Sequence, residues 1–238
     1  MPFQLRQLLH RAHDYFMNDD ACRITYSQFG EDVVIHHLLI HEIKKQGSGF
    51  YVDIGAFHPR DKSNTKFLSI LGWKGINVDA NEASIALFRR ERPNDINLCC
   101  GVALKAGEMT YYKFSGVEAA NTVSPDTARK YQEESGRQLS GTSIIPVLTI
   151  NQILGQYLGP NQEIDVMNID IEGLDEEVVQ SMDLSQYRPK ILLIELNDLD
   201  KFAVLDNPAV RHLRNNDYSL FSINIATSIF VDNKARKI

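Results

Sequence analysis

The sequence predicts an α/β protein with a mostly parallel seven-stranded sheet and helices on both of its faces. Short apolar segments of strand length alternate with segments of helical period, and short turns join them. The chain has 238 residues, a length that suits one such domain. Because crossovers between parallel strands are right-handed, this alternation predicts an open sheet covered on both sides.

Composition narrows the class of protein. The chain is 43% hydrophobic and 24% charged, as in ordinary soluble globular proteins. It has no apolar run of membrane-spanning length, and its first residues lack a signal-peptide core, so we expect a cytoplasmic location. The net charge of −6 argues against a nucleic-acid partner. Cys22, Cys99 and Cys100 form neither a metal-binding spacing nor a disulfide framework.

Two helices are expected before the first strand. Residues 3–17 place apolar side chains at helical spacing, and a second helix is expected from Gln28 to about Lys45, stopped by the glycines that follow. The predicted apolar face of this second helix comprises Val33, Val34, Leu38 and Ile43.

The strand and helix alternation starts at residue 50. The predicted strands of the sheet cover residues 50–54, 76–79, 96–100, 164–170, 190–196, 218–223 and 228–232. The predicted helices begin after a cap at Asp61 or Ser63, cover residues 82–91, 149–157 and 208–215, and begin near Leu174. Only a short turn separates the last two strands, which predicts that they pair antiparallel.

Residues 107–146 interrupt this rhythm. Residues 109–114 have the composition of an extra strand, and residues 116–141 are polar and rich in Ser, Thr, Glu and Gly. We interpret the polar part as a long surface insertion. Long loops in compact domains commonly serve as lids or binding loops.

Seven strands with a terminal hairpin are the layout of class I methyltransferases, which have a Rossmann-like fold. In open α/β sheets, ligands bind outside the carboxyl ends of the strands. Acidic side chains end four of the first five predicted strands, namely Asp53, Asp79, Asp170 and Glu195. One such acid is more often a helix cap than a ligand. Four together favour a site, in which Asp79 would accept hydrogen bonds from ribose hydroxyls.

Glycine usage separates two cofactor classes. Gly55 follows the first strand and would let a cofactor approach the backbone. The GxGxxG pattern of nicotinamide-binding domains is absent, which disfavours an NAD-dependent oxidoreductase.

Five segments occur in an order that resembles the FkbM family of S-adenosylmethionine (SAM)-dependent methyltransferases. They are residues 26–32 (YSQFGED), 52–56 (VDIGA), 63–65 (SNT), 72–79 (GWKGINVD) and 168–173 (NIDIEG). The resemblance covers about residues 26–196. It implies a class I methyltransferase fold and methylation of hydroxyl oxygens on sugars, glycans or polyketide-type natural products.

The resemblance also implies the cofactor, SAM, and the residues that hold it. Residues 1–47 would form a helical extension covering the cofactor site, and residues 48–238 the methyltransferase domain, with the insertion at 107–146. Many family members continue D-x-G-A-N-x-G, whereas this chain has Phe57 and Pro59 at those last positions. The implied cofactor-binding residues are Gln28, Asp53, Gly55, Ala56, Ser63, Thr65, Asp79, Asn81, Val102 and Asp170.

Methyl transfer to oxygen requires a group that accepts the hydroxyl proton. Asp170 is our first candidate, followed by Glu172 or Glu195. His58 titrates in a suitable range, but it could equally be a histidine packed beside Pro59.

The same strand ends could in principle hold Mg²⁺, through Asp170, Glu195, Asn197 and Asp198. Hydrogen bonding and capping explain these residues more simply, so no metal is predicted. The expected partner is a small-molecule or glycan hydroxyl acceptor. The alternatives are a methyltransferase acting on nitrogen of nucleic acid or protein, and a catalytically silent binding module. The sequence leaves open whether the chain forms a homo-oligomer.

Overall fold

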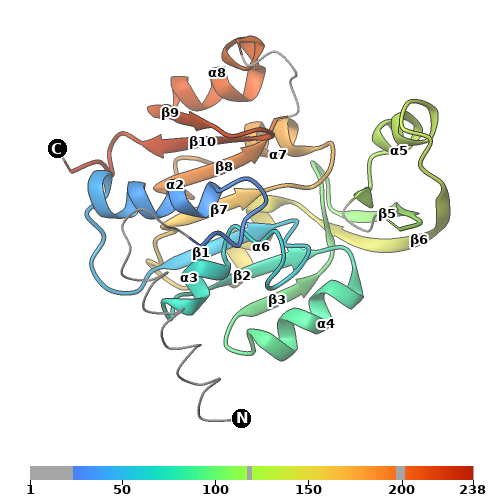
Figure 1. The fold of residues 1–238 in the computed structure, drawn as a ribbon, viewed down its shortest axis with the longest axis horizontal. Helices are drawn as coiled ribbons and strands as arrows, with labels where there is room; N and C mark the ends of the chain where they lie inside the picture. The colour runs from blue at the N-terminus through green and yellow to red at the C-terminus, as the bar shows by residue number, and fades with distance from the viewer. Residues whose placement is uncertain (1–23, 117–119, 197–201, 238) are drawn as a thin grey trace, which may run out of the picture.

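The structure is a computed structural model that describes residues 24–116, 120–196 and 202–237. Its main sheet follows the predicted layout. Its strands lie in the order β3-β2-β1-β7-β8-β10-β9 (Figure 1). Neighbours are parallel except where β10 pairs with β8 and β9. The Rossmann-like prediction is therefore confirmed, including the antiparallel final pair. The strands are β1 (Phe50–Ile54), β2 (Lys74–Asp79), β3 (Ile96–Cys99), β7 (Val166–Ile169), β8 (Ile191–Glu195), β9 (Tyr218–Ile223) and β10 (Thr227–Asp232).

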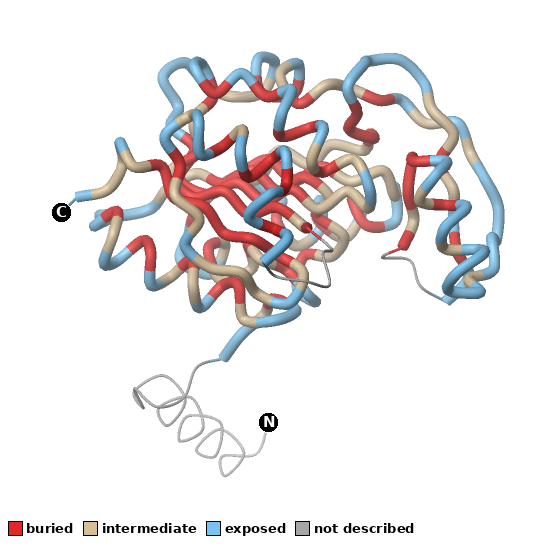
Figure 2. Tube along the Cα trace, turned by 90° about the horizontal axis from the view of Figure 1, so that it is seen from above, coloured by how far each residue is buried: buried red, intermediate tan, exposed pale blue. Residues whose placement is uncertain are grey.

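The central strands are buried on both faces, as parallel strands between two helical layers must be. Successive side chains alternate between the faces, so Val52 and Ile54 pack in one core cluster while Tyr51 packs in the other. The middle of the molecule is accordingly a continuous band of buried strand (Figure 2). This rigid band fixes the positions of the strand ends.

Most predicted helices are confirmed, and side-chain caps explain where they start. Asn81 caps the helix that follows β2, Thr149 and Gln152 form a capping box, and Asn207 caps the last helix. The helix expected after Asp61 or Ser63 begins later, following Thr65. These helices are α3 (Lys66–Ile70), α4 (Glu82–Glu91), α6 (Ile150–Tyr157), α7 (Asp175–Ser181) and α8 (Pro208–Asn215), with a 3₁₀ turn η3 (Ala203–Asp206) before α8.

The first described helix is shorter than predicted and buries a different face. It is α2 (Glu31–His37), continued by a π-helical turn η1 (Leu38–Glu42). Val33 is 39% exposed, so placing it on the core face was wrong, and Val34 is only half-buried. The buried residues Ile35, Leu38 and Leu39 keep the i, i+3, i+4 spacing of an α-helix, and Val33 falls outside that stripe. The side chains in the core are Ile35, Leu38, Leu39 and Ile43.

The insertion is a folded unit, so the loop predicted for residues 116–141 was wrong. It contains β5 (Gly107–Phe114), α5 (Pro125–Glu133) and most of β6 (Leu139–Leu148), and the short strand β4 (Gly101–Val102) lies just before it. The strands form a second sheet in the order β4-β6-β5, which projects from one side of the main sheet (Figure 1). The extra strand expected at 109–114 lies within β5.

Among the described residues, no helix is long and apolar enough to cross a membrane. The helix expected at residues 3–17 lies outside the described residues.

Candidate active site

A cavity of about 620 Å³ lies where the carboxyl ends of the main strands face the insertion. Parallel strands all end at the same edge of a sheet, so residues far apart in sequence meet there. Thr65 and His58 do not line this cavity. The predicted site residues that do line it are Gln28, Asp53, Gly55, Ala56, Ser63, Asp79, Asn81, Val102, Asp170, Glu172 and Glu195.

Asp53, at the end of β1, is 2% exposed and held by neutral donors. Its carboxylate accepts hydrogen bonds from Thr65 Oγ1 at 2.6 Å and from Asn168 Nδ2 at 3.0 Å. Burial raises the pKa of Asp53, and these two hydrogen bonds partly oppose the rise. The two neutral donors, Thr65 and Asn168, therefore fix the Asp53 carboxylate in place.

Behind Asp53 lies a buried arginine that the sequence analysis did not single out. Arg92 is 6% exposed, and its guanidinium donates to Thr65 Oγ1 at 2.9 Å and to Ser63 Oγ at 3.0 Å. Thr65 thus joins Arg92 to Asp53 rather than facing the cavity. Ser63 contacts both Arg92 and the cavity, so the predicted pair of hydroxyl residues is divided between two layers.

Asp79, at the end of β2, is positioned by backbone donors. Its two oxygens accept from Phe57 N at 2.8 Å and from Asn81 N at 2.7 Å. Desolvation raises its pKa to about 6, and the backbone hydrogen bonds oppose the rise. A carboxylate has about four lone-pair sites, so both oxygens can still accept from a ligand in the cavity.

Gly55 is required by the protein itself as well as by any ligand. Its φ is +81°, and an added Cβ would overlap the carbonyl oxygen of Asp170. The chain leaving β1 therefore passes directly against the chain leaving β7. Only glycine combines that conformation with so close an approach.

Asp170 and Glu195 form a carboxyl pair at the ends of β7 and β8. Desolvation, the Glu195 charge and a hydrogen bond between the two side chains hold the pKa of Asp170 well above its usual range. Two carboxyl groups this close do not both ionise readily, because each charge opposes the other. Because its pKa is raised, ionised Asp170 holds a proton more strongly than a free aspartate does.

Glu172 lies on the turn that follows β7, in a backbone conformation that non-glycine residues rarely adopt. Its φ is +57°, and its carboxylate accepts a hydrogen bond from Tyr131 Oη of α5. Its backbone carbonyl accepts from Thr122 Oγ1 at 2.7 Å. Desolvation raises the pKa of Glu172, opposed by that hydrogen bond and by the charges of Arg137 and Lys62. The insertion therefore hydrogen-bonds both the side chain and the backbone of Glu172 in this turn.

His58 is engaged outside the cavity. Its Nδ1 accepts from Asp61 N at 2.9 Å and from Arg60 N at 3.2 Å. This ring nitrogen organises the turn after Gly55 and is not directed at the other candidate bases.

The metal alternative has partial geometric support. Oxygen atoms of Asp170, Asp175 and Glu195 lie within 4.8 Å of one another. The Asp175 oxygens, however, accept from Ile171 N at 2.8 Å and Gly173 N at 3.0 Å, so this residue organises the turn. Asn197 and Asp198 lie outside the described residues. The expectation that no metal is bound stays a prediction.

Several cavity residues were not among the predicted site residues. Asn168 lay within the quoted NIDIEG segment, and its hydrogen bonds to Asp53 and Asn64 explain why an amide stands there. Most of those from the insertion were missed because residues 116–141 were expected to form a loop, and Tyr111 lies in the extra strand predicted at 109–114. The additional polar and aromatic residues are Phe57, Lys62, Asn64, Ser84, Tyr111, Asn121, Thr122, Thr127, Lys130, Tyr131, Arg137 and Asn168.

Comparison with known families identifies the chain. The protein-family model of the methyltransferase FkbM domain matches residues 53–220, which is more than half of the sequence. The chain belongs to the FkbM methyltransferase family. This match confirms the resemblance to the FkbM methyltransferases seen in the sequence, and it fits the predicted enzyme class and the predicted cofactor, SAM.

Similarity to solved structures is distant. An FkbM methyltransferase from Methylobacillus flagellatus KT has a TM-score of 0.46 and 14% identity, over 77% of this chain and 43% of that one. An O-methyltransferase from Bacillus cereus in complex with SAH has a TM-score of 0.41 and 13% identity, over 97% of this chain and 90% of that one. This chain thus aligns with less than half the length of the Methylobacillus protein. No curated protein matches the chain significantly.

Proposed function

We propose that this FkbM-family chain transfers a methyl group from SAM to a hydroxyl oxygen of a sugar, glycan or related natural product. The observation that carries the proposal is the single cavity shared by the carboxyl ends of β1, β2, β7 and β8 and by the insertion. One wall offers the acids that a cationic cofactor needs, and the other offers a separate polar surface for an acceptor. The nitrogen-acceptor alternative has no such specific observation in its favour.

The hydrogen-bonding groups that line the cavity fit SAM, which carries a sulfonium, an ammonium, a carboxylate and a ribose. Asp79 would accept from the ribose hydroxyls, since its oxygens keep free lone pairs. Asp53 would accept from the ammonium group. Ser63 would donate to the carboxylate, and Gln28 would cover that end from the N-terminal segment.

The remaining cofactor contacts would be apolar or through the backbone. Val102 is 3% exposed and, like Asn81, lines the cavity, and we assign these two residues to the adenosine part. Ala56 and Gly55 would border the methionine part. Thr65 would act from behind by orienting Asp53.

When bound, SAM supplies an electrophilic methyl carbon. Asp170 would accept the hydroxyl proton as the new carbon–oxygen bond forms. A base is most effective when its pKa lies near the working pH, and the neighbouring Glu195 moves the pKa of Asp170 in that direction. Glu172 would orient the acceptor, because Tyr131 already holds its carboxylate.

The proposal is tested by measuring SAH release from the purified chain with a panel of hydroxylated sugars and glycosides. General-base catalysis contributes about 10²–10⁴-fold, so Asp170→Asn should lower kcat by at least about 100-fold. Its dissociation constant for SAH should stay within about threefold of that of the unmodified chain. Asp126→Asn, on the 88% exposed side chain of Asp126, is the matched control and should keep full activity.

Normal turnover by Asp170→Asn would remove Asp170 as the base. SAH binding without transfer to any hydroxyl would favour the silent binding module instead.

A further inference from the structure

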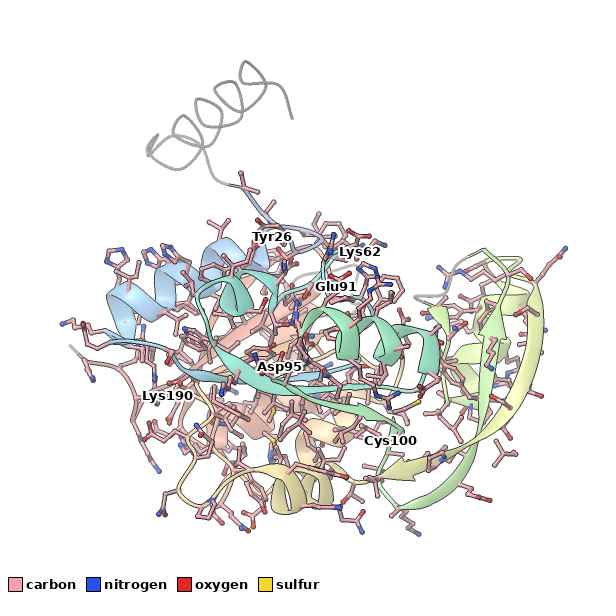
Figure 3. All side chains as sticks on the ribbon, turned by 90° about the horizontal axis from the view of Figure 1, so that it is seen from below. Tyr26, Lys62, Glu91, Asp95, Cys100 and Lys190 are labelled. Carbon is pink, nitrogen blue, oxygen red and sulfur yellow. The ribbon has the colours of Figure 1, made fainter. Side chains whose placement is uncertain are left out.

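Three cationic side chains line the cavity without a role in the transfer described above. They are Lys62, on the loop between β1 and α3 (Figure 3), Lys130 on α5, and Arg137 just before β6. They come from separate segments, so their convergence is produced by the tertiary structure.

Arg137 is held in a defined orientation. Its guanidinium carbon lies 4.1 Å from the centre of the Tyr131 ring, and its backbone N donates to Tyr131 O at 3.0 Å. Tyr131 is in turn fixed by its hydrogen bond to Glu172. Stacking on an aromatic face pre-orients the planar guanidinium and lowers the entropy lost on binding a ligand.

Lys130 and Lys62 approach the same space. Thr127, Lys130 and Tyr131 are spaced so that they share one face of α5, and all three line the cavity. On the opposite side, Lys62 is held at φ +55°, and both Lys62 and Arg137 lower the pKa of Glu172 by their charge. Lys62 and Arg137 therefore act on the same turn from segments far apart in the sequence, and Lys130 lines the same cavity.

Within the described residues, no carboxylate forms an ion pair with any of these three cations. The nearest cavity acids are otherwise engaged. Thr65 and Asn168 hold Asp53, backbone N–H groups hold Asp79, and the Tyr131 hydroxyl holds Glu172. The three cations therefore line the cavity without a carboxylate in ion-pair contact, although the charges of Lys62 and Arg137 act on Glu172.

We propose that the methyl acceptor is an acidic hydroxyl compound, whose carboxylate or phosphate group is bound by Arg137 and Lys130. The inference rests on the proposed function and names its substrate class. A guanidinium fork matches the oxygen pairs of carboxylates and phosphates, and a lysine adds a mobile point charge. Lys62 adds positive potential from the facing loop.

The test is calorimetric titration of the SAH-saturated chain with glucose 6-phosphate, glucuronate and glucose at constant ionic strength. We expect at least one acidic probe to bind about tenfold or more tightly than glucose. A response to glucose 6-phosphate alone identifies phosphate, and a response to glucuronate alone identifies carboxylate. Arg137→Gln and Lys130→Gln should each weaken that binding about tenfold.

The matched control is Arg129→Gln, which removes a cation adjacent to Lys130 in sequence. Arg129 is 68% exposed and pairs with Asp126, outside the cavity. It should bind the probes as the unmodified chain does. The inference is overturned if neither acidic probe binds more tightly than glucose, or if Arg137→Gln and Lys130→Gln bind them unchanged. If the chain fails to bind SAH when it is titrated with SAH before the probes are added, that result counts against the proposed function itself.

Discussion

The two walls of the cavity are built in different ways. The main-sheet wall presents carboxyl groups on the ends of buried strands, and the hydrogen bonds that fix Asp53 and Asp79 include donors from other segments of the chain. The insertion wall presents cations and a tyrosine on exposed or half-buried elements with a small core of their own, formed by Phe114, Ala120 and Ala128. The rigid main-sheet wall suits a ligand that stays the same, such as a cofactor. The side chains of the insertion wall can be substituted with little cost to the stability of the fold.

The two walls meet at the turn after β7. An added Cβ at Gly173 would overlap the Thr127 side chain, so the turn and α5 are in direct contact. Thr122 and Tyr131 hydrogen-bond Glu172 in the same turn. The insertion is therefore in direct contact with the turn that begins beside Asp170.

The largest effect should separate the stabilities of the two walls. Gly55→Ala combines a left-handed backbone with overlap on the Asp170 carbonyl, and we expect a loss of more than about 3 kcal/mol in the free energy of unfolding. Gly136→Ala, at φ +62° with nothing within 4 Å, should cost only about 1–2 kcal/mol. Urea unfolding of both variants measures the difference. Equal losses would show that the close approach at Gly55 is unimportant.

A smaller effect is expected on SAH affinity, which should depend on the main-sheet wall and not on the insertion wall. Asp79→Ala removes the acceptor at the end of β2, and losing charged hydrogen bonds of about 1.5–3 kcal/mol predicts about 100-fold weaker SAH binding. Arg137→Gln, on the other wall, should change SAH affinity less than twofold. Calorimetry with SAH compares the two. Unchanged affinity in Asp79→Ala would remove the ribose assignment.

The smallest predicted effect is a pH dependence that belongs to the main-sheet wall. Because the pKa of Asp79 is raised to about 6, its carboxylate is ionised above that pH and takes up a proton below it. A ligand that requires the ionised form should therefore bind about tenfold more weakly for each pH unit below 6. SAH titrations between pH 5 and 8 test this, and Asp79→Asn should lack the transition centred near 6.

The accuracy of the sequence predictions follows the same division. Val52, Ile54 and the apolar run of β8 are buried on both faces, so their composition indicated strands without further context. In the insertion, α5 buries only Ala128, and β6 contains Pro146. Neither segment has a strong apolar period, and Pro146 is tolerated because β4 pairs only with the two residues after it. Their structure depends on contacts that no local pattern records.

The sequence by itself determined the sheet, its strand ends and the acids placed there, because hydrophobic periodicity and the shared edge of parallel strands are local rules with a fixed geometric result. Only the tertiary structure decided that Thr65 acts behind Asp53 and that Asp170 pairs with Glu195. It also decided that Lys130 and Arg137 face the same cavity. Those relations depend on distances between segments remote in sequence, and such distances exist only once the chain has packed.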